Sequence, residues 1–97
     1  MWIVKRKTLQ DYWLKHRNCE QYLKEWFHIA KKAHWNSIAD IKKLYPSADL
    51  VGSDKVVFNV KGNHYRLIVK INFKHNKIWI KFIGTHAEYY KIDVTSL

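Results

Sequence analysis

Residues 55–83 read KVVFNVKGNHYRLIVKINFKHNKIWIKFI, and apolar and polar side chains alternate along most of this segment. A period of two is typical of β-strands that bury one face. Short turn sequences, KGN at 61–63 and HN at 75–76, divide the segment. Tight turns between consecutive strands predict an antiparallel three-stranded meander. The strands are expected at residues 55–60, 64–73 and 77–83.

The alternation assigns the side chains of the meander to two faces. The apolar face is expected to carry Tyr65, Leu67, Val69, Ile71, Phe73, Ile78, Ile80 and Phe82. The opposite face is expected to carry His64, Arg66, Ile68, Lys70, Asn72, Lys74, Lys77, Trp79, Lys81 and Ile83. We expect helices to cover the apolar face. The cations of the opposite face, Arg66 and Lys70 among them, then remain open to solvent.

The residues before the meander predict one short strand and three helices. Thr8 is a candidate N-cap for the first helix, and Asn18 with Gln21 has the spacing of a capping box for the second. Pro46 ends the third helix. The strand is expected at residues 2–4, and the helices at 8–16, 19–33 and from about 38 to 44.

A further short helix is predicted after the meander, because Thr85 and Glu88 have the spacing of a capping box. It is expected to run to about residue 92. This order of elements predicts a single small α+β domain over residues 1–97, with the N-terminal strand and helices packed on one face of the antiparallel meander. A chain of 97 residues that is 47% hydrophobic is long enough and apolar enough to build one core.

The chain is strongly basic, with a net charge of +10, and residues 55–87 contain no carboxylate. The cations of that segment are Lys55, Lys61, Arg66, Lys70, Lys74, Lys77 and Lys81. They lack local anions, so we expect them to be solvated or to meet an external polyanion. Aromatic side chains between them offer surfaces on which bases stack, which favours RNA as the partner.

Other classes of function are disfavoured by composition. The single cysteine, Cys19, excludes an intrachain disulfide, and in its helical pattern it is interpreted as a small apolar filler. No apolar run approaches the ~20 residues of a membrane-spanning helix, so no membrane partner is expected. The cysteine usage favours a cytoplasmic location.

Two motifs resemble those of a known family. VFNVKGNHYRLI at 57–68 resembles a segment of HigB-type toxins, and FIGTHAEY at 82–89 resembles their C-terminal signature. These toxins belong to the RelE/ParE superfamily, and length, charge and element order agree as well. The resemblance implies a RelE-like fold and a ribosome-dependent mRNA endonuclease. Tyr90 stands where relatives often have Asp.

The resemblance also implies partners. Toxins of this kind act on mRNA at the ribosome, where rRNA is a further contact. They are held inactive by a HigA-type antitoxin that carries a helix-turn-helix. Operator DNA is then bound only indirectly, through that antitoxin. A net charge of +10 independently favours an acidic neutralising protein.

RNA can be cleaved without a metal when its own 2′-OH attacks the adjacent phosphate. An enzyme that uses this route helps to remove the 2′-OH proton, stabilises the phosphorane charge and protonates the 5′-oxygen. A metal-dependent nuclease needs clustered carboxylates, and the cationic face of the predicted meander has none. We therefore expect neither a metal nor another cofactor.

Four residues are the candidates for catalysis. His86 is the acid/base candidate, because imidazole ordinarily titrates near neutral pH; the alternative is a capping or packing histidine. Arg66 is the candidate phosphate clamp, since a guanidinium binds two phosphate oxygens at once; the alternative is a solvated strand residue. Lys81 is a candidate charge stabiliser. Tyr89 is a candidate for base stacking or for proton donation to the leaving oxygen, unless its ring only closes the core.

A second group of residues is assigned to RNA binding rather than to catalysis. Asn59 is expected to reach the groove in which RNA binds, whereas Asn63 is interpreted as a turn residue. His64 shares the face of Arg66 but adjoins a turn, where a solvated histidine is the alternative. Trp79 is a base platform or a core residue. The full set of RNA-binding candidates is Asn59, His64, Lys70, Lys74, Lys77 and Trp79.

The residues leave three functions open. The first is an mRNA endonuclease toxin. The second is a ParE-like toxin that binds DNA gyrase and cuts nothing, which would not need a His/Tyr/Arg cluster on the sheet. The third is a noncatalytic RNA-binding module that uses the same cations and rings.

Overall fold

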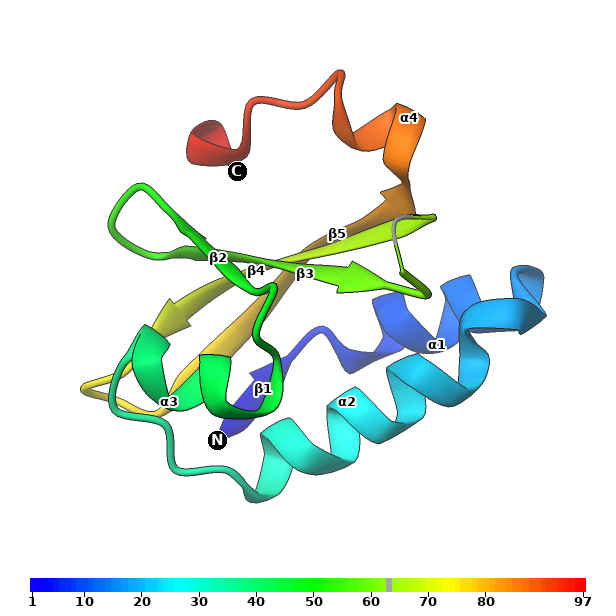
Figure 1. Cartoon of the computed structure of the whole chain (residues 1–97). Helices are drawn as coiled ribbons and strands as arrows, with labels where there is room; N and C mark the ends of the chain where they lie inside the picture. Colours follow the sequence, from blue (N-terminus) through cyan, green and yellow to red (C-terminus); the bar gives the residue numbers. More distant parts are fainter. Residues whose placement is uncertain (63) are drawn as a thin grey trace.

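The computed structural model describes residues 1–62 and 64–97, so the predicted turn residue Asn63 lies outside the described residues. Its centre is a five-stranded sheet in the order β1-β5-β4-β3-β2 (Figure 1). The strands are β1 (Trp2–Val4), β2 (Asp49–Val51), β3 (Lys55–Val60), β4 (Tyr65–Asn72) and β5 (Lys77–Thr85). β3, β4 and β5 form the predicted antiparallel meander. β1 extends it in parallel beside β5, and the unpredicted β2 pairs antiparallel with β3.

Three helices lie on one side of the sheet, as predicted, while α4 and the C-terminal residues lie on the other (Figure 1). The helices are α1 (Arg6–Lys15), α2 (Glu20–Lys32), α3 (Ile38–Leu44) and α4 (His86–Tyr89), with 3-10 turns η1 (Arg17–Cys19) and η2 (Val94–Ser96). The structure therefore has the predicted α+β class and helix arrangement. Within the described residues, no helix is long and apolar enough to cross a membrane.

The predicted helix caps have mixed outcomes. α1 begins after Lys5, whose backbone is left-handed (φ 68°), and not at Thr8. α2 follows Cys19 without a side-chain cap, so the predicted box of Asn18 and Gln21 is wrong. The reason is local: the 3-10 turn η1 leads directly into α2, and its geometry replaces a capping side chain. The capping box that begins at Thr85 is confirmed, but α4 is shorter than predicted.

The main core lies between the helices and one face of the sheet. α2 contributes Leu23, Trp26 and Ala30, all fully buried, which follow the 3.6-residue period of an amphipathic helix. The Trp26 ring meets Phe58 of β3 edge-on, with 5.5 Å between ring centres. We call this side of the sheet the first face and the opposite side the second face.

A β-bulge changes which side chains of β5 belong to each face. Ile80 pairs with Val69 and Phe82 pairs with Ile68, so Lys81 is an extra residue in β5. Ile83 therefore joins the main core, whereas Phe82 belongs to a second cluster on the other face. The predicted assignment of Phe82 to the helix-covered face, and of Ile83 to the opposite face, is wrong because alternation was continued through the bulge.

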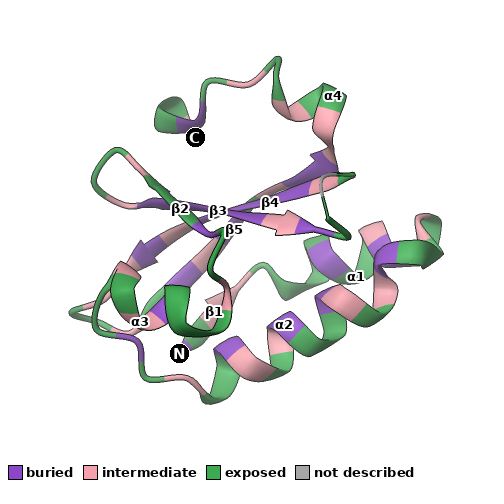
Figure 2. Ribbon diagram, in the orientation of Figure 1, coloured by how far each residue is buried: buried purple, intermediate pink, exposed green. Residues whose placement is uncertain are grey.

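The second face is partly covered. Val57, Ile68 and Val94 are buried together there, and Phe82 and Leu97 pack against them. The C-terminal residues thus lie across the middle of the second face, and Figure 2 colours most of β3 and β4 as buried. The expectation that this face is open is wrong, because apolar residues after α4 cover its centre.

We predict that Gly84→Ala destabilises the protein by about 1–3 kcal/mol, the usual cost of overpacking. A Cβ atom at Gly84 would lie 2.4 Å from Cζ of Phe82, so the ring would have to move. Urea unfolding measures the change in the free energy of unfolding. The penalty should shrink when Phe82 is first replaced by leucine, and an equal penalty in both backgrounds would show that the ring is not the cause.

Candidate functional site

The candidate site lies on the second face, at the end of the sheet next to α4. Arg66 of β4 stands between Asn59 of β3 and Gly84 of β5 in the strand register. Only 8% of its surface is exposed, so the predicted solvent-exposed guanidinium is wrong. Its guanidinium carbon lies 5.6 Å from the centre of the Tyr89 ring, and this ring accounts for part of the burial.

The Arg66 guanidinium has few partners. Its Nη1 donates a hydrogen bond to the Tyr65 carbonyl at 3.1 Å, which uses one of five N–H donors. In the part of the chain that the structure describes, no carboxylate forms an ion pair with it. A buried cation without an anion is unfavourable by itself. The remaining donors therefore suit an external anion with several acceptor oxygens, such as a phosphate.

Backbone contacts fix the position of His86 at the start of α4. Thr85 Oγ1 accepts a hydrogen bond from the Glu88 amide at 3.2 Å, and Glu88 Oε1 accepts one from the Thr85 amide at 2.8 Å. The His86 amide also donates to the carbonyl of His64 at 2.9 Å. Hydrogen bonds from Thr85 lower the pKa of Glu88. The cap is therefore fully formed above the ordinary pKa of glutamate and is lost as pH falls through the lowered value.

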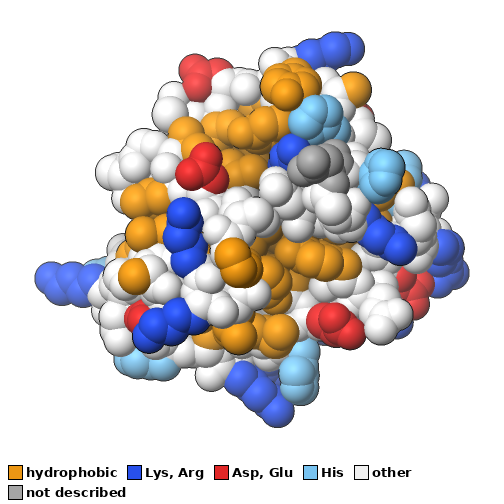
Figure 3. All heavy atoms as spheres, in the orientation of Figure 1, with side chains coloured by type: hydrophobic (Ala, Val, Ile, Leu, Met, Phe, Trp, Pro, Cys, Tyr) orange, Lys and Arg blue, Asp and Glu red, His pale blue; other side chains and the backbone are white. Residues whose placement is uncertain are grey.

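Aromatic rings connect His86 to Arg66. The imidazole lies edge-on to the Tyr90 ring, with 4.5 Å between ring centres, and Tyr90 is 6.0 Å from Tyr89. Tyr89 in turn adjoins Arg66. We call Arg66, Tyr89, Tyr90 and His86 the Arg66–His86 cluster. Figure 3 shows a histidine, a basic side chain and apolar side chains meeting beside α4.

Two atoms of this cluster differ in access to solvent. His86 Nδ1 is buried and has no hydrogen-bond partner among the described residues. His86 as a whole is only partly buried, and a neutral imidazole whose Nδ1 makes no hydrogen bond to the described residues is free to act through Nε2. Tyr90 is 73% exposed, so its ring forms an open wall next to the imidazole. The sequence interpretation missed this contact, although positions 86 and 90 have the i, i+4 spacing of helical neighbours.

The other predicted site residues lie in different places. Lys81 occupies the bulge in β5 and is exposed. His64 is exposed and contributes its backbone carbonyl. Lys70 is four residues from Arg66, which is about 13 Å along an extended strand. Lys74 and Lys77 are exposed still farther away, at the turn between β4 and β5. Trp79 is partly buried, and Lys70 Nζ lies 5.6 Å from its ring centre.

Two of the cations predicted to be unpaired have a carboxylate nearby. Asp54 directly precedes the acid-free segment, and its Oδ1 lies 3.1 Å from Nζ of Lys55, a residue only 5% exposed. Its Oδ2 lies 3.9 Å from Nζ of Lys70. The expectation that these cations pair with nothing inside the protein is wrong for Lys55. Lys70 shares the same carboxylate at a longer distance.

Tyr12 and His16 lie outside the Arg66–His86 cluster, on the side of the main core, but close enough to Glu88 of α4 to affect it electrostatically. His16 stacks on Tyr12 with 4.1 Å between ring centres, on the helix side of the sheet. Burial raises the pKa of the Tyr12 hydroxyl to about 12, so it stays protonated at neutral pH. Burial also raises the pKa of the Cys19 thiol, which makes it a poor nucleophile. Among the described residues, no group of three or more His, Cys, Asp or Glu is placed to hold a metal ion.

The α+β fold, with helices packed on a five-stranded mixed sheet, is that of a small RelE-like protein. Residues 19–92 match the HigB toxin family, described as the RelE-like toxic component of a toxin–antitoxin system. The chain belongs to this family, in agreement with the resemblance of its two motifs.

Curated relatives cover nearly the whole chain. This chain is 30% identical to the mRNA interferase toxin HigB of Escherichia coli K12 over 91 aligned residues. The alignment covers 92% of this chain and 88% of that protein. This chain is 26% identical to the mRNA interferase HigB of Escherichia coli O6:H1 strain CFT073 over 94 aligned residues. That alignment covers 95% of this chain and 91% of that protein. An mRNA interferase HigB of Shigella flexneri is 30% identical over 91 residues.

Proposed function

We propose that this chain is an endoribonuclease toxin of a type II toxin–antitoxin system and that it cleaves mRNA on the ribosome. The observation that carries the proposal is Arg66, a buried guanidinium without a carboxylate partner among the described residues. It lies in one cluster with an imidazole and two phenols. The names of the relatives, which are mRNA interferases, support the same reaction.

In the proposed mechanism the 2′-oxygen of the RNA forms a bond to the adjacent phosphorus and the bond from phosphorus to the 5′-oxygen breaks. Arg66 binds the nonbridging phosphate oxygens and stabilises their growing charge. His86, through Nε2, transfers a proton at one of the two ribose oxygens, and the Tyr89 hydroxyl is the candidate group at the other. The products are a 2′,3′-cyclic phosphate and a 5′-hydroxyl. Lys81 adds positive charge at the bulge.

The proposal includes partners. RNA binding involves Asn59 beside Arg66 and His64 at the same end of the sheet. It also involves residues toward the other end of the sheet: Lys70, Lys74, Lys77 and Trp79. A HigA-type antitoxin with a helix-turn-helix neutralises the toxin and alone links it to operator DNA. The family membership supports an antitoxin in general, and the net charge of +10 favours one with an acidic surface. The site of action is the cytoplasm, where ribosomes and mRNA are found.

Expression in growing bacteria tests the proposed function. We expect new mRNA 5′-ends to appear within minutes, and purified toxin with ribosomes should yield fragments ending in 2′,3′-cyclic phosphate, with or without EDTA. Gyrase-dependent DNA damage with intact mRNA would contradict the proposal and favour a ParE-like toxin. Ribosome binding without new 5′-ends would indicate a noncatalytic RNA-binding protein. Activity lost in EDTA and restored by Mg²⁺ would contradict the metal-free route.

A further inference from the structure

A second group of aromatic and basic side chains lies on the second face, at the end opposite the Arg66–His86 cluster. Lys70 of β4 pairs with Trp79 of β5, and Lys77 of β5 pairs with Trp2 of β1. Trp2 and Trp79 therefore occupy diagonal positions on neighbouring strands. We call Trp2, Lys70, Lys77 and Trp79 the tryptophan platform.

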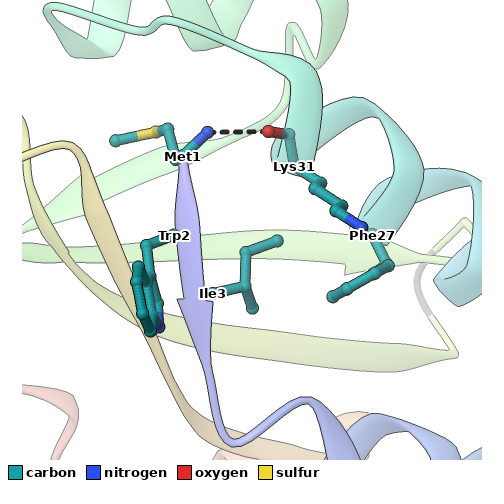
Figure 4. A pocket seen from close by; sticks show the side chains of 5 residues that line it. All are labelled: Met1, Trp2, Ile3, Phe27 and Lys31. Atoms are coloured by element: carbon teal, nitrogen blue, oxygen red, sulfur yellow. Dashed lines mark hydrogen bonds between the residues drawn. The ribbon is translucent and has the colours of Figure 1, made fainter.

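Trp2 is the more exposed of the two tryptophans in the platform, with 72% of its surface accessible to solvent. Its neighbour Ile3 packs against the main core, and strand alternation then directs Trp2 to the second face. Figure 4 shows the Trp2 ring and Ile3 on opposite sides of β1, with Phe27 on the side of Ile3. A single exposed apolar residue is common on protein surfaces, but Trp2 lies diagonal to a second ring, Trp79, with lysines beside both.

The backbone around Trp2 is firmly held. The Trp2 amide donates to the Asn76 carbonyl at 2.8 Å. The preceding Met1 nitrogen donates to the carbonyls of Lys31 and Ala33, both at 2.9 Å (Figure 4 draws the bond to Lys31). The anchored strand fixes the backbone of Trp2, so only the two side-chain torsions of its ring lose freedom when a ligand covers it.

The charge around the rings favours an anionic ligand. Lys77 is exposed and makes no ion pair within the described residues. Lys70 lies 5.6 Å from the Trp79 ring centre, and it shares the single carboxylate of Asp54 with Lys55, so one positive charge remains uncompensated. Exposed rings between cations match single-stranded nucleic acid, whose bases stack while its phosphates meet the lysines. An acidic protein surface would also pair with these lysines, but the exposed rings between them are matched by unpaired bases, which stack on aromatic side chains.

The platform is separate from the proposed cleavage site. Lys70 and Arg66 are about 13 Å apart along β4, and the buried cluster of Val57, Ile68 and Val94 lies between the two ends of the face. One nucleotide does not reach both. An RNA strand that is cleaved at the Arg66–His86 cluster would meet the platform with bases farther along the chain.

We propose that the tryptophan platform binds unpaired bases of single-stranded RNA at a distance from the scissile phosphate, with Trp2 as the stacking residue. This inference rests on the proposed function for the identity of the RNA. It adds a binding site that requires unpaired substrate and that increases affinity without taking part in the chemistry.

The test measures binding of the full chain to a fluorescent 2′-O-methyl RNA dodecamer, which lacks the attacking hydroxyl and stays intact. We expect Trp2→Ala and Trp2→Leu each to weaken binding about tenfold, within the range that loss of one stacked base produces. Trp2→Phe should stay within about threefold of the wild type, since it keeps a ring. Leu14→Ala, at another exposed apolar residue, should have no effect. Binding to a duplex of equal length should not depend on Trp2.

Several results would overturn the platform. Affinity for the single strand that is unchanged in Trp2→Ala would do so, as would equal losses for single strand and duplex. Weaker binding of a neutralising antitoxin by Trp2→Ala, with RNA affinity unchanged, would identify a protein-binding surface instead. Cleavage of mRNA by the wild-type chain is measured in parallel. If the wild-type chain cleaves mRNA but RNA affinity does not depend on Trp2, only this inference is refuted. If the wild-type chain does not cleave mRNA, the proposed function is refuted.

Discussion

Arg66→Ala is expected to lower kcat/KM for mRNA cleavage by about a hundredfold or more, the usual effect of removing a donor from a site of developing charge. The guanidinium is buried between Asn59 and Gly84 and is in contact with the Tyr89 ring. In the proposed mechanism its donors bind the phosphate both before and during the reaction. KM should therefore rise and kcat should fall together. Single-turnover kinetics on ribosome-bound mRNA separate the two effects.

Arg66→Lys is the matched control for this prediction. Lysine keeps the charge but loses the planar fork that binds two phosphate oxygens. We expect it to recover affinity for RNA and to leave most of the defect in kcat. A lysine variant with full activity would show that only charge is needed. Thermal unfolding of both variants is needed, because the buried arginine also packs on Tyr89, and loss of folding in Arg66→Ala makes Arg66→Lys the decisive variant.

His86→Ala is expected to lower kcat by about two orders of magnitude or more, as loss of general acid/base catalysis typically does. KM should change little, because the imidazole acts on a proton and not on the bound phosphate. The fold should survive, since the position of residue 86 is set by its backbone amide and by the capping box of Thr85 and Glu88. Rapid-quench measurement of fragment release gives kcat directly.

Two variants separate proton transfer from packing at this position. His86→Gln keeps a polar side chain of similar length but does not exchange protons near neutral pH, so it should be as inactive as His86→Ala. Tyr90→Ala removes the ring that packs edge-on against the imidazole and should cost less than tenfold by this reasoning. Equal losses in Tyr90→Ala and His86→Ala would mean that ring packing, and not proton transfer, explains the defect.

Alternation in the sequence was enough to predict the meander and its core face up to Ile80. It was not enough beyond that point, because the extra residue Lys81 reverses the faces of Phe82 and Ile83 without leaving a break in the apolar pattern. β2 was missed for a different reason. It has three residues, too few for a period to be recognised, and it forms only because β3 offers it an edge.

For the candidate site, the sequence predicted the position of His86 in the chain's local structure better than the surroundings of Arg66. The capping spacing from Thr85 to Glu88 is local in sequence, so it placed His86 correctly at the start of a helix. The burial of Arg66 depends on Tyr89 of α4, which is distant from it along the chain. The separation of Arg66 from the lysines at the other end of the second face depends on Val94, which packs on Ile68 between them. Such long-range contacts leave no local pattern in the sequence.

We propose that RNA is cleaved at the Arg66–His86 cluster on the second face. The most direct test is a cryo-EM structure of the His86→Ala chain on a ribosome that carries mRNA. We predict a backbone phosphate within hydrogen-bonding distance of the Arg66 guanidinium, about 2.7–3.2 Å, with the 2′-hydroxyl facing the position of the missing imidazole. Messenger RNA bound to the helix side of the sheet, with Arg66 out of reach of any phosphate, would show that cleavage does not occur at this cluster.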